Sequence, residues 1–293
     1  MTDQRALLDE IRREIDAIDT QLHDLIMRRF SLSEQIAAVK SGGVSNGSLP
    51  LAQAARPGRE AEIIRRLLAR HEGNTPPDVI VRLWREIVTA SLMLQTAVSV
   101  EIFGSEDPHE IWDLARGYFG SSVPMQERST AKEVLRDLSN GECAFGVLPM
   151  PQQDEREPWW PQLSTLRAGT PRIVARLPFV GPNEGPSAFL VAAVEPDDVG
   201  EMISVFTLAS NQALSRNRIN GWLEQASFEG HCIASIEYGS SGNDYLHLVT
   251  FGGLRDAKDA IFADLGSLSD GAFREPTFIG AYPKPIILDR PAG

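Results

Sequence analysis

Residues 11–40 read IRREIDAIDTQLHDLIMRRFSLSEQIAAVK, and this stretch decides the fold of the first third of the chain. Apolar residues recur in and before it at spacings of three and four, which predicts one amphipathic helix that ends before Gly42-Gly43. The apolar stripe consists of Leu8, Ile11, Ile15, Ile18, Leu22, Leu25, Leu32, Ile36 and Val39. A helix of about 55 Å cannot bury such a stripe within one small three-helix unit, so we expect it to pack against the same helix of a second copy.

Three cations mark this helix, namely Arg12, Arg29 and Lys40. Arg29 and Lys40 are separated by about 20° around the helix axis and therefore share a face, where two long side chains can converge on one small molecule. Arg12 lies about 25 Å from Arg29 along the axis and on another side, so it could only serve the site of a partner helix. The alternative is that these cations are exposed and pair with acids one turn away, because Asp16 follows Arg12 by four residues.

A second helix is predicted to begin at Pro57 and to end by Gly73. Its first turn carries Arg59 and Glu60 side by side. On their own, these two residues could form an ordinary polar first turn of a helix.

A third helix is predicted to start at Thr75, a candidate N-cap, and to continue to about Ala97. Ser91 and Gln95 lie one turn apart on this mostly apolar helix. A buried amide needs a partner, so Gln95 is either a hydrogen-bonding core residue or part of a binding site. Together, the polar residues of the three helices predict a site for a small dianion.

The charge of the chain changes near Ser99. Residues 1–100 hold 13 Lys and Arg and 13 Asp and Glu, whereas the whole chain of 293 residues has a net charge of −12. The acidic balance disfavours nucleic acid as a partner, because phosphate binding needs a basic face. No apolar run has membrane length and the first residues are highly charged, so we expect a cytoplasmic protein without a membrane partner. Cys143 and Cys232 form neither a zinc pattern nor a disulfide framework, and we expect both to be buried.

The remainder of the chain alternates between strand and helix patterns. Residues 98–199 form an α/β region, with predicted strands at 98–103 and 144–148 and predicted helices at 108–118 and 130–138. Residues 200–293 predict the order βαββαβ of a ferredoxin-like domain, with elements at 202–208, 216–226, 232–238, 245–251, 256–268 and 277–282. The expected fold class is therefore α+β multidomain, with an all-α three-helix domain at residues 1–97 preceding these two regions.

Three runs of the helical part resemble the all-helical class of chorismate mutases over about residues 5–97. They are IRREIDAIDTQLHDLIMRRFSLSEQIAAVK, RPGREAEIIRRL and LWREIVTASLMLQ. The resemblance implies a homodimer in which Arg12 is donated across the interface to the site of the other copy. It also implies the roles of the remaining site residues: Arg29 and Arg59 would bind the substrate carboxylates with help from Ser91, Lys40 and Gln95 would face the ether oxygen, and Glu60 would hold the ring hydroxyl.

The implied reaction is the [3,3] rearrangement of chorismate to prephenate in the biosynthesis of phenylalanine and tyrosine. It requires no nucleophile, metal or cofactor. It requires a compact substrate conformer and donors that stabilise the negative charge developing on the ether oxygen. One position departs from the pattern, because Arg56 stands where an acid often contacts the ring hydroxyl.

The segment STAKEVLRDLSNGECAFGVLPM is similar to part of the first lobe of prephenate dehydratases, and the βαββαβ tail resembles an ACT regulatory domain. The Thr-Arg-Phe motif of dehydratases is replaced by Ser187-Ala188-Phe189, and the Glu-Ser-Arg-Pro motif of ACT domains by residues 235–238, SIEY. We therefore expect a degenerate dehydratase-like region and a tail that could be a packing or dimerisation module. The alternatives are a bifunctional mutase and dehydratase, or a non-catalytic regulatory protein that retains the mutase dimer.

Overall fold

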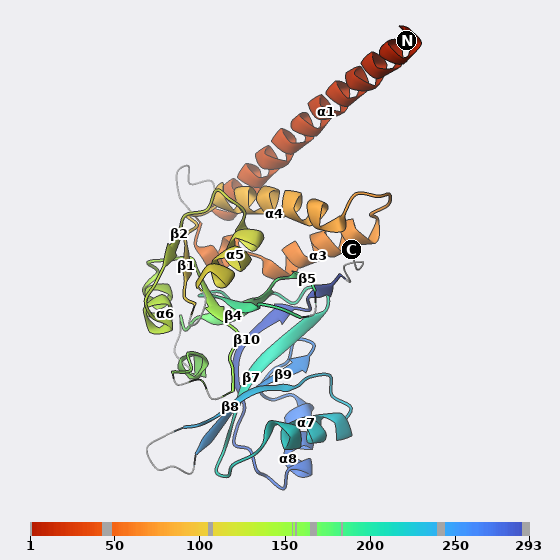
Figure 1. The fold of residues 1–293 in the computed structure, drawn as a ribbon. Coiled ribbons are helices and arrows are strands. Elements are labelled where there is room, and N and C mark those ends of the chain that lie inside the picture. The colour runs from red at the N-terminus through yellow and green to blue at the C-terminus, as the bar shows by residue number, and fades with distance from the viewer. Residues whose placement is uncertain are drawn as a thin grey trace.

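The computed structural model describes residues 2–42, 49–104, 108–153, 155, 157–164, 169–182, 184–238 and 244–288. Four helices form the N-terminal part, and a large sheet with its own helices follows (Figure 1). The N-terminal helices are α1 (Thr2–Lys40), α2 (Leu51–Ala54), α3 (Pro57–Ala69) and α4 (Pro77–Met93).

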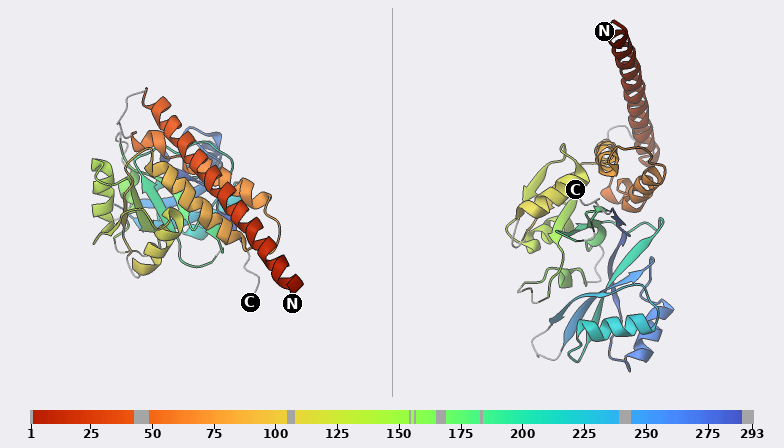
Figure 2. Two further views of the ribbon diagram at one scale, coloured as in Figure 1. Left: turned by 90° about the horizontal axis from the view of Figure 1, so that it is seen from above. Right: turned by 45° about the vertical axis from the view of Figure 1, so that its right-hand side comes forward.

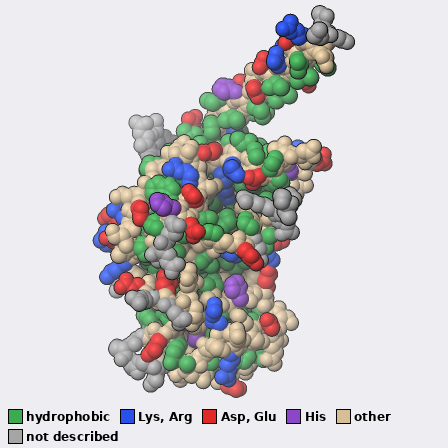
Figure 3. Space-filling model, in the orientation of Figure 1, with side chains coloured by type: hydrophobic (Ala, Val, Ile, Leu, Met, Phe, Trp, Pro, Cys, Tyr) green, Lys and Arg blue, Asp and Glu red, His purple; other side chains and the backbone are tan. Residues whose placement is uncertain are grey.

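Helix α1 confirms the predicted long helix, and most of its length projects away from the rest of the molecule (Figures 1 and 2). The apolar stripe is exposed in the single chain: Ile11 is 45% exposed and Val39 is 81% exposed. Hydrophobic side chains therefore run along the projecting helix (Figure 3). Only the C-terminal end of α1, near Ser33, is covered by the other helices.

The boundaries of the other two predicted helices need small corrections. Pro57 occupies the first turn of α3 as expected. Helix α4 has Pro76 rather than Thr75 at its N-cap, without a side-chain cap, so the prediction for Thr75 is wrong. It ends at Met93, which places Gln95 in the turn after the helix rather than on it. The short helix α2 was not predicted, because its four residues are too few to show a period.

Among the described residues, one sheet of nine strands dominates the rest of the chain, in the order β2-β1-β3-β6-β4-β10-β7-β9-β8. Its strands are β1 (Val100–Ile102), β2 (Met125–Glu127), β3 (Phe145–Pro149), β4 (Arg172–Leu177), β6 (Ala188–Ala192), β7 (Met202–Ser210), β8 (Cys232–Glu237), β9 (Tyr245–Gly252) and β10 (Thr277–Pro283). A second, two-stranded sheet pairs β5 (Val180–Gly181) with β11 (Ile286–Ile287).

The first part of the large sheet confirms the predicted α/β alternation. Strand β1 pairs in parallel with β2 and β3, and the helices α5 (Pro108–Phe119) and α6 (Ala131–Asn140) pack against it. The antiparallel strands β6 and β4 then extend the sheet. The buried pair Trp159 and Trp160 precedes them, with Trp160 opening the 3-10 helix η1 (Trp160–Ser164).

The C-terminal part has the predicted order βαββαβ, completed by helices α7 (Arg216–Gln225) and α8 (Ala260–Leu268). Its four strands stand in the order β10-β7-β9-β8, and every neighbouring pair is antiparallel. The far edge of β10 pairs with β4 of the preceding region, where Gly280 is opposite Ile173. One sheet therefore crosses the boundary predicted at residue 200.

The two cysteines are buried, as predicted, with Cys143 at 8% and Cys232 at 3% exposure. Among the described residues, no helix combines the length and the hydrophobicity needed to cross a membrane.

Candidate active site

The end of α1 meets the C-terminal half of α4 through Arg29 and Ser91. The Arg29 guanidinium donates to the Ser91 hydroxyl and, at 3.4 Å, to the Ile87 carbonyl oxygen. Ser91 in turn donates to the same carbonyl at 2.8 Å. Burial lowers the pKa of Arg29 from its ordinary value. Two predicted site residues, 62 positions apart in the chain, are thus in direct contact.

Gln95 joins this pair from the turn after α4. Its side-chain amide donates to the Ser91 carbonyl oxygen at 2.9 Å. The backbone carbonyl oxygen of Gln95 accepts a hydrogen bond from the Leu49 backbone N–H at 2.9 Å, and the Thr96 hydroxyl donates to the Leu49 carbonyl oxygen at 2.7 Å. These bonds attach the start of the α2 segment to the end of α4.

Lys40 reaches the same α2 segment from the last turn of α1. Its ammonium donates to the Gln53 carbonyl oxygen at 2.6 Å. Burial and the neighbouring Arg56 guanidinium lower the pKa of Lys40. The structure therefore gathers Arg29, Lys40 and Gln95 around the junction of α1, α2 and α4, and no acid among the described residues forms an ion pair with either cation.

Arg59 lies in the first turn of α3 with its side chain half exposed. Its guanidinium pairs with Glu62 of the same helix. Its backbone N–H, like that of Gly58, donates to the carboxylate of Asp197, which comes from the connector after β6. The backbone of Arg59 is therefore held by Asp197, while its half-exposed side chain is paired only within its own helix.

Glu60 contacts residues of α4 and α5. Its carboxylate accepts from Arg85 of α4 at 3.3 Å and from the Tyr118 hydroxyl of α5 at 3.4 Å. The Arg85 guanidinium also lies 4.0 Å from the centre of the Tyr118 ring. Burial is the main cause that raises the pKa of Glu60. These contacts give Glu60 a role between α3, α4 and α5, and its predicted contact with a ring hydroxyl stays a prediction.

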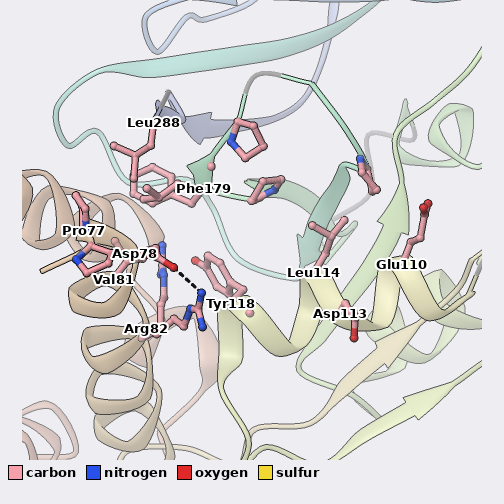
Figure 4. A pocket seen from close by; sticks show the side chains of 18 of the residues that line it. Pro77, Asp78, Val81, Arg82, Glu110, Asp113, Leu114, Tyr118, Phe179 and Leu288 are labelled. Atoms are coloured by element: carbon pink, nitrogen blue, oxygen red, sulfur yellow. Dashed lines mark hydrogen bonds and ion pairs between the residues drawn. The ribbon is translucent and has the colours of Figure 1, made fainter. Parts of the chain in front are cut away.

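A cavity of about 770 Å³ lies on the outer side of this ion pair, between α4, α5 and the loop of β5 (Figure 4). Arg85 and Tyr118 form part of its wall, with Phe179 and Leu114. Arg82 pairs with Asp78 at its edge. None of the residues predicted to bind a dianion lines this cavity.

Arg12 is far from the other predicted site residues in the single chain. Its guanidinium is 3.4 Å from the Asp9 carboxylate, in a pair that is mostly exposed. The partner is thus Asp9, three residues earlier, instead of the Asp16 that the spacing suggested. About 25 Å of helix separates Arg12 from Arg29.

Two residues of this region escaped the sequence analysis, the buried Arg85 and the partly buried Asp197. Arg85 could have been found, because it falls between Val81 and Val88 on the apolar face of α4, where a charge needs a partner. Asp197 gives no such signal, because its contact with α3 joins residues almost 140 positions apart.

The junction of α1, α2 and α4 offers two cations, a hydroxyl and an amide donor. Guanidinium groups suit planar carboxylates because they can donate two parallel hydrogen bonds. Lys40 and Gln95 add an ammonium and a neutral donor that need no proton transfer to act. The arrangement can bind a compact dianion and stabilise negative charge that develops on it.

Comparisons with known proteins agree with this chemistry. Residues 11–96 match the family model of chorismate mutase type II. The bifunctional chorismate mutase/prephenate dehydratase of Pseudomonas aeruginosa is 30% identical over 155 residues, which is 53% of this chain and 41% of the relative. The protein of the same description from Aquifex aeolicus is 29% identical over 147 residues, 49% of this chain and 38% of the relative.

The matched part of this chain thus spans about two fifths of the length of each relative. Among solved structures, prephenate dehydratase from Streptococcus mutans aligns with 63% of this chain and 97% of that chain, at 11% identity and a TM-score of 0.41. The match of 155 residues is longer than the range 11–96 and includes part of the sheet region. Residues 11–96, which include the helices α3 and α4 and most of α1, are thus the part of this chain that matches the chorismate mutase type II family.

Proposed function

We propose that this chain is an isomerase that converts chorismate to prephenate, and that it does so as a homodimer. The observation that carries the proposal is the meeting of Arg29, Lys40 and Gln95 within the family's matched range. Two cations with lowered pKa and no acidic partner among the described residues favour an anionic ligand, because an anion would offset the desolvation of both and the repulsion between Lys40 and Arg56.

Each residue has a defined part in the proposed reaction. Arg29, supported by Ser91, binds a substrate carboxylate. Lys40 and Gln95 donate to the ether oxygen, where negative charge grows as the C–O bond breaks. Arg59 binds the second carboxylate after leaving Glu62, and Arg12 enters from the partner copy.

The dimer completes both the fold and the site. The stripe of α1 remains exposed in one chain, and an exposed apolar face of this length indicates a protein interface. An antiparallel partner helix would cover the stripe and bring its Arg12 towards Arg29. A non-catalytic scaffold would also bury the stripe, but it would not need Lys40 and Gln95.

The test is chorismate consumption by the purified chain and by Lys40→Ala. Loss of one preorganised donor in a site of this kind lowers kcat by about 100-fold to 1,000-fold, so we expect a loss of that size. Lys132→Ala is the matched control, because Lys132 is an exposed lysine on α6 and far from the junction. Equal kcat values for the wild type and Lys40→Ala would refute the site.

Prephenate dehydration is the second candidate function. The relatives' names include this activity, and the match extends past the mutase domain. The Ser187-Ala188-Phe189 segment lacks the threonine and arginine of the dehydratase motif, so we place the mutase reaction first. Adding prephenate instead of chorismate and measuring phenylpyruvate separates the two.

A further inference from the structure

The first turn of α3 carries a cap that comes from a distant part of the chain. Helix α3 begins after Arg56, which provides no side-chain hydrogen bond to the first turn, and Pro57 has no N–H to satisfy. The two N–H groups that follow both reach Asp197: Gly58 N is 2.9 Å from Oδ1 and Arg59 N is 3.2 Å from Oδ2. A carboxylate at this end of a helix satisfies free N–H groups and complements the helix dipole.

The residue at position 58 fits this contact. A Cβ on Gly58 would lie 2.9 Å from Asp197 Oδ1 and 3.1 Å from the Asp197 carbonyl oxygen. A side chain there would push the carboxylate away from both N–H groups. Asp197 can therefore make both hydrogen bonds only because residue 58 has no side chain.

A second contact fixes α3 nearly two turns later. Arg65 donates to the Lys284 carbonyl oxygen at the end of β10 and, at 3.4 Å, to the Glu201 carbonyl oxygen. Its guanidinium also lies 5.6 Å from the centre of the Phe179 ring. The connector 195–201 and the end of β10 therefore hold one face of α3 against the sheet.

The contact matters for the site because Arg59 depends on it. The Arg59 side chain is half exposed, and its ion pair is with Glu62 of the same helix. Because both partners move with α3, this pair does not fix the position of Arg59 relative to the other helices. The position of Arg59 relative to Lys40 and Arg29 is set by where the first turn of α3 lies. Asp197 holds that turn through the Arg59 N–H itself.

We propose that Asp197 is a positioning residue for the mutase site, through which the connector before the ferredoxin-like part sets the place of Arg59. This inference rests on the proposed function. The sheet region would then affect substrate binding by positioning Arg59, and none of its own groups would contact the substrate.

The experiment measures kcat and KM for chorismate in Asp197→Ala, Asp197→Asn and the matched control Asp198→Ala, whose carboxylate is the exposed neighbour. We expect Asp197→Ala to raise KM by about tenfold, equivalent to about 1.4 kcal/mol, with a smaller change in kcat. Asp197→Asn keeps an acceptor oxygen and should recover part of the loss. Asp198→Ala should match the wild type.

A double-mutant comparison separates positioning from general support of the fold. In an Arg59→Ala background, Asp197→Ala should change KM by less than twofold, because the positioned side chain is gone. The same tenfold rise in both backgrounds would overturn the proposal. A fall in KM in Asp197→Ala would also overturn it, since it would show that the carboxylate competes with the substrate for the first turn of α3.

Hydrogen exchange keeps this test independent of the proposed function. In Asp197→Ala and Asp197→Asn, the Gly58 and Arg59 amides should exchange faster than in the wild type, while Asp198→Ala leaves them unchanged. If the wild type does not turn over chorismate, the proposed function fails. Faster exchange of the Gly58 and Arg59 amides in the Asp197 variants would then show that Asp197 caps α3 without positioning a mutase site. Unchanged exchange would show that the contact is absent in solution.

Discussion

At the scale of single residues, the buried histidine His247 shows how the sheet accommodates a titratable group. Its ring is fully buried on β9, with Nε2 2.9 Å from the Ser210 hydroxyl and Nδ1 2.8 Å from the Ser235 hydroxyl. A neutral imidazole has one donor and one acceptor nitrogen, and two hydroxyls can satisfy both. Burial lowers the pKa of His247 to about 4. His247 is therefore a buried residue whose two ring nitrogens both have partners.

This pKa predicts an acid dependence of stability. Because the pKa is below the ordinary 6.5 in the folded chain, the unfolded chain binds more protons between pH 6.5 and 4. The contribution of His247 is therefore complete above pH 6.5 and is lost as the pH falls towards 4, by about 2 kcal/mol at pH 5. Urea unfolding at pH 7 and pH 5 should show a smaller loss in His247→Gln than in the wild type. The exposed His23→Gln should behave as the wild type, and equal losses in all three chains would contradict the assignment.

The neighbours Arg59 and Glu60 show that a sequence pattern can locate polar residues on a helix without predicting which partners their side chains contact. The resemblance assigned both to the substrate, yet consecutive residues of a helix are about 100° apart around its axis. In the structure, Glu60 turns to Arg85 and Tyr118, whereas Arg59 stays at the surface. Tyr118 lies in α5, outside the mutase match, so the pattern of the mutase domain alone could not include it.

At the scale of elements, α1 is the helix whose apolar stripe remains exposed, without a packing partner among the described residues of the single chain. Its periodicity predicted the helix because one pattern continues over 39 residues, and the structure confirms it. The short strands β4 and β6 were missed for the opposite reason. Strand β6 is buried along its whole length and β4 is buried except at Arg172 and Arg176, so neither sequence shows a regular alternation. Both strands also follow stretches rich in proline and glycine.

The exposed stripe and Arg12 together predict complementation between inactive chains. Arg12→Ala and Lys40→Ala should each be inactive, but their mixed dimer has one intact site. With random exchange, half of the dimers are mixed and half of their sites are intact, so we expect about one quarter of the wild-type activity. Chorismate turnover after unfolding and refolding the two chains together measures this recovery.

The controls for this experiment lie on the two faces of α1. Ile18→Asp, added to both chains, places a charge in the stripe and should prevent recovery by yielding monomers in analytical ultracentrifugation. Thr20→Asp lies on the opposite face, about 200° away, and should leave recovery intact. Mixed dimers without recovered activity would refute the donation of Arg12, while the rest of the site could remain as proposed.

At the scale of the whole molecule, one sheet unites regions that the sequence separated. The order βαββαβ was predictable because each of its strands has a clear pattern and a helix of ordinary length follows two of them. The pairing of β10 with β4 was not, because it depends on a close approach between residues more than a hundred positions apart. The buried cluster around Trp159 and Trp160 also draws residues from both sides of the predicted boundary, including Phe189 and Leu248.

Gly280 is the residue on which this junction depends. Its φ is 150°, and a Cβ there would lie 2.3 Å from the Ile173 carbonyl oxygen and 2.4 Å from the Ile173 nitrogen. Any side chain would therefore separate β10 from β4. The backbone of Ile173 cannot move aside easily, because β4 is also paired with β6 on its other edge.

We therefore expect Gly280→Ala to lower the free energy of unfolding by about 3 kcal/mol or more, from backbone strain and steric overlap together. Gly266→Ala is the matched control: Gly266 lies within α8 with open space at its Cβ, so alanine there should raise stability by up to about 1 kcal/mol.

Urea unfolding measures both variants, and hydrogen exchange of β4 and β7 tests the junction. In the wild type, both strands should exchange with the same free energy, because they open together. In Gly280→Ala the two values should separate, as the ferredoxin-like part comes loose from β4. An unchanged unfolding midpoint in Gly280→Ala would mean that the two backbones are not in contact, and that the boundary at residue 200 divides independent domains.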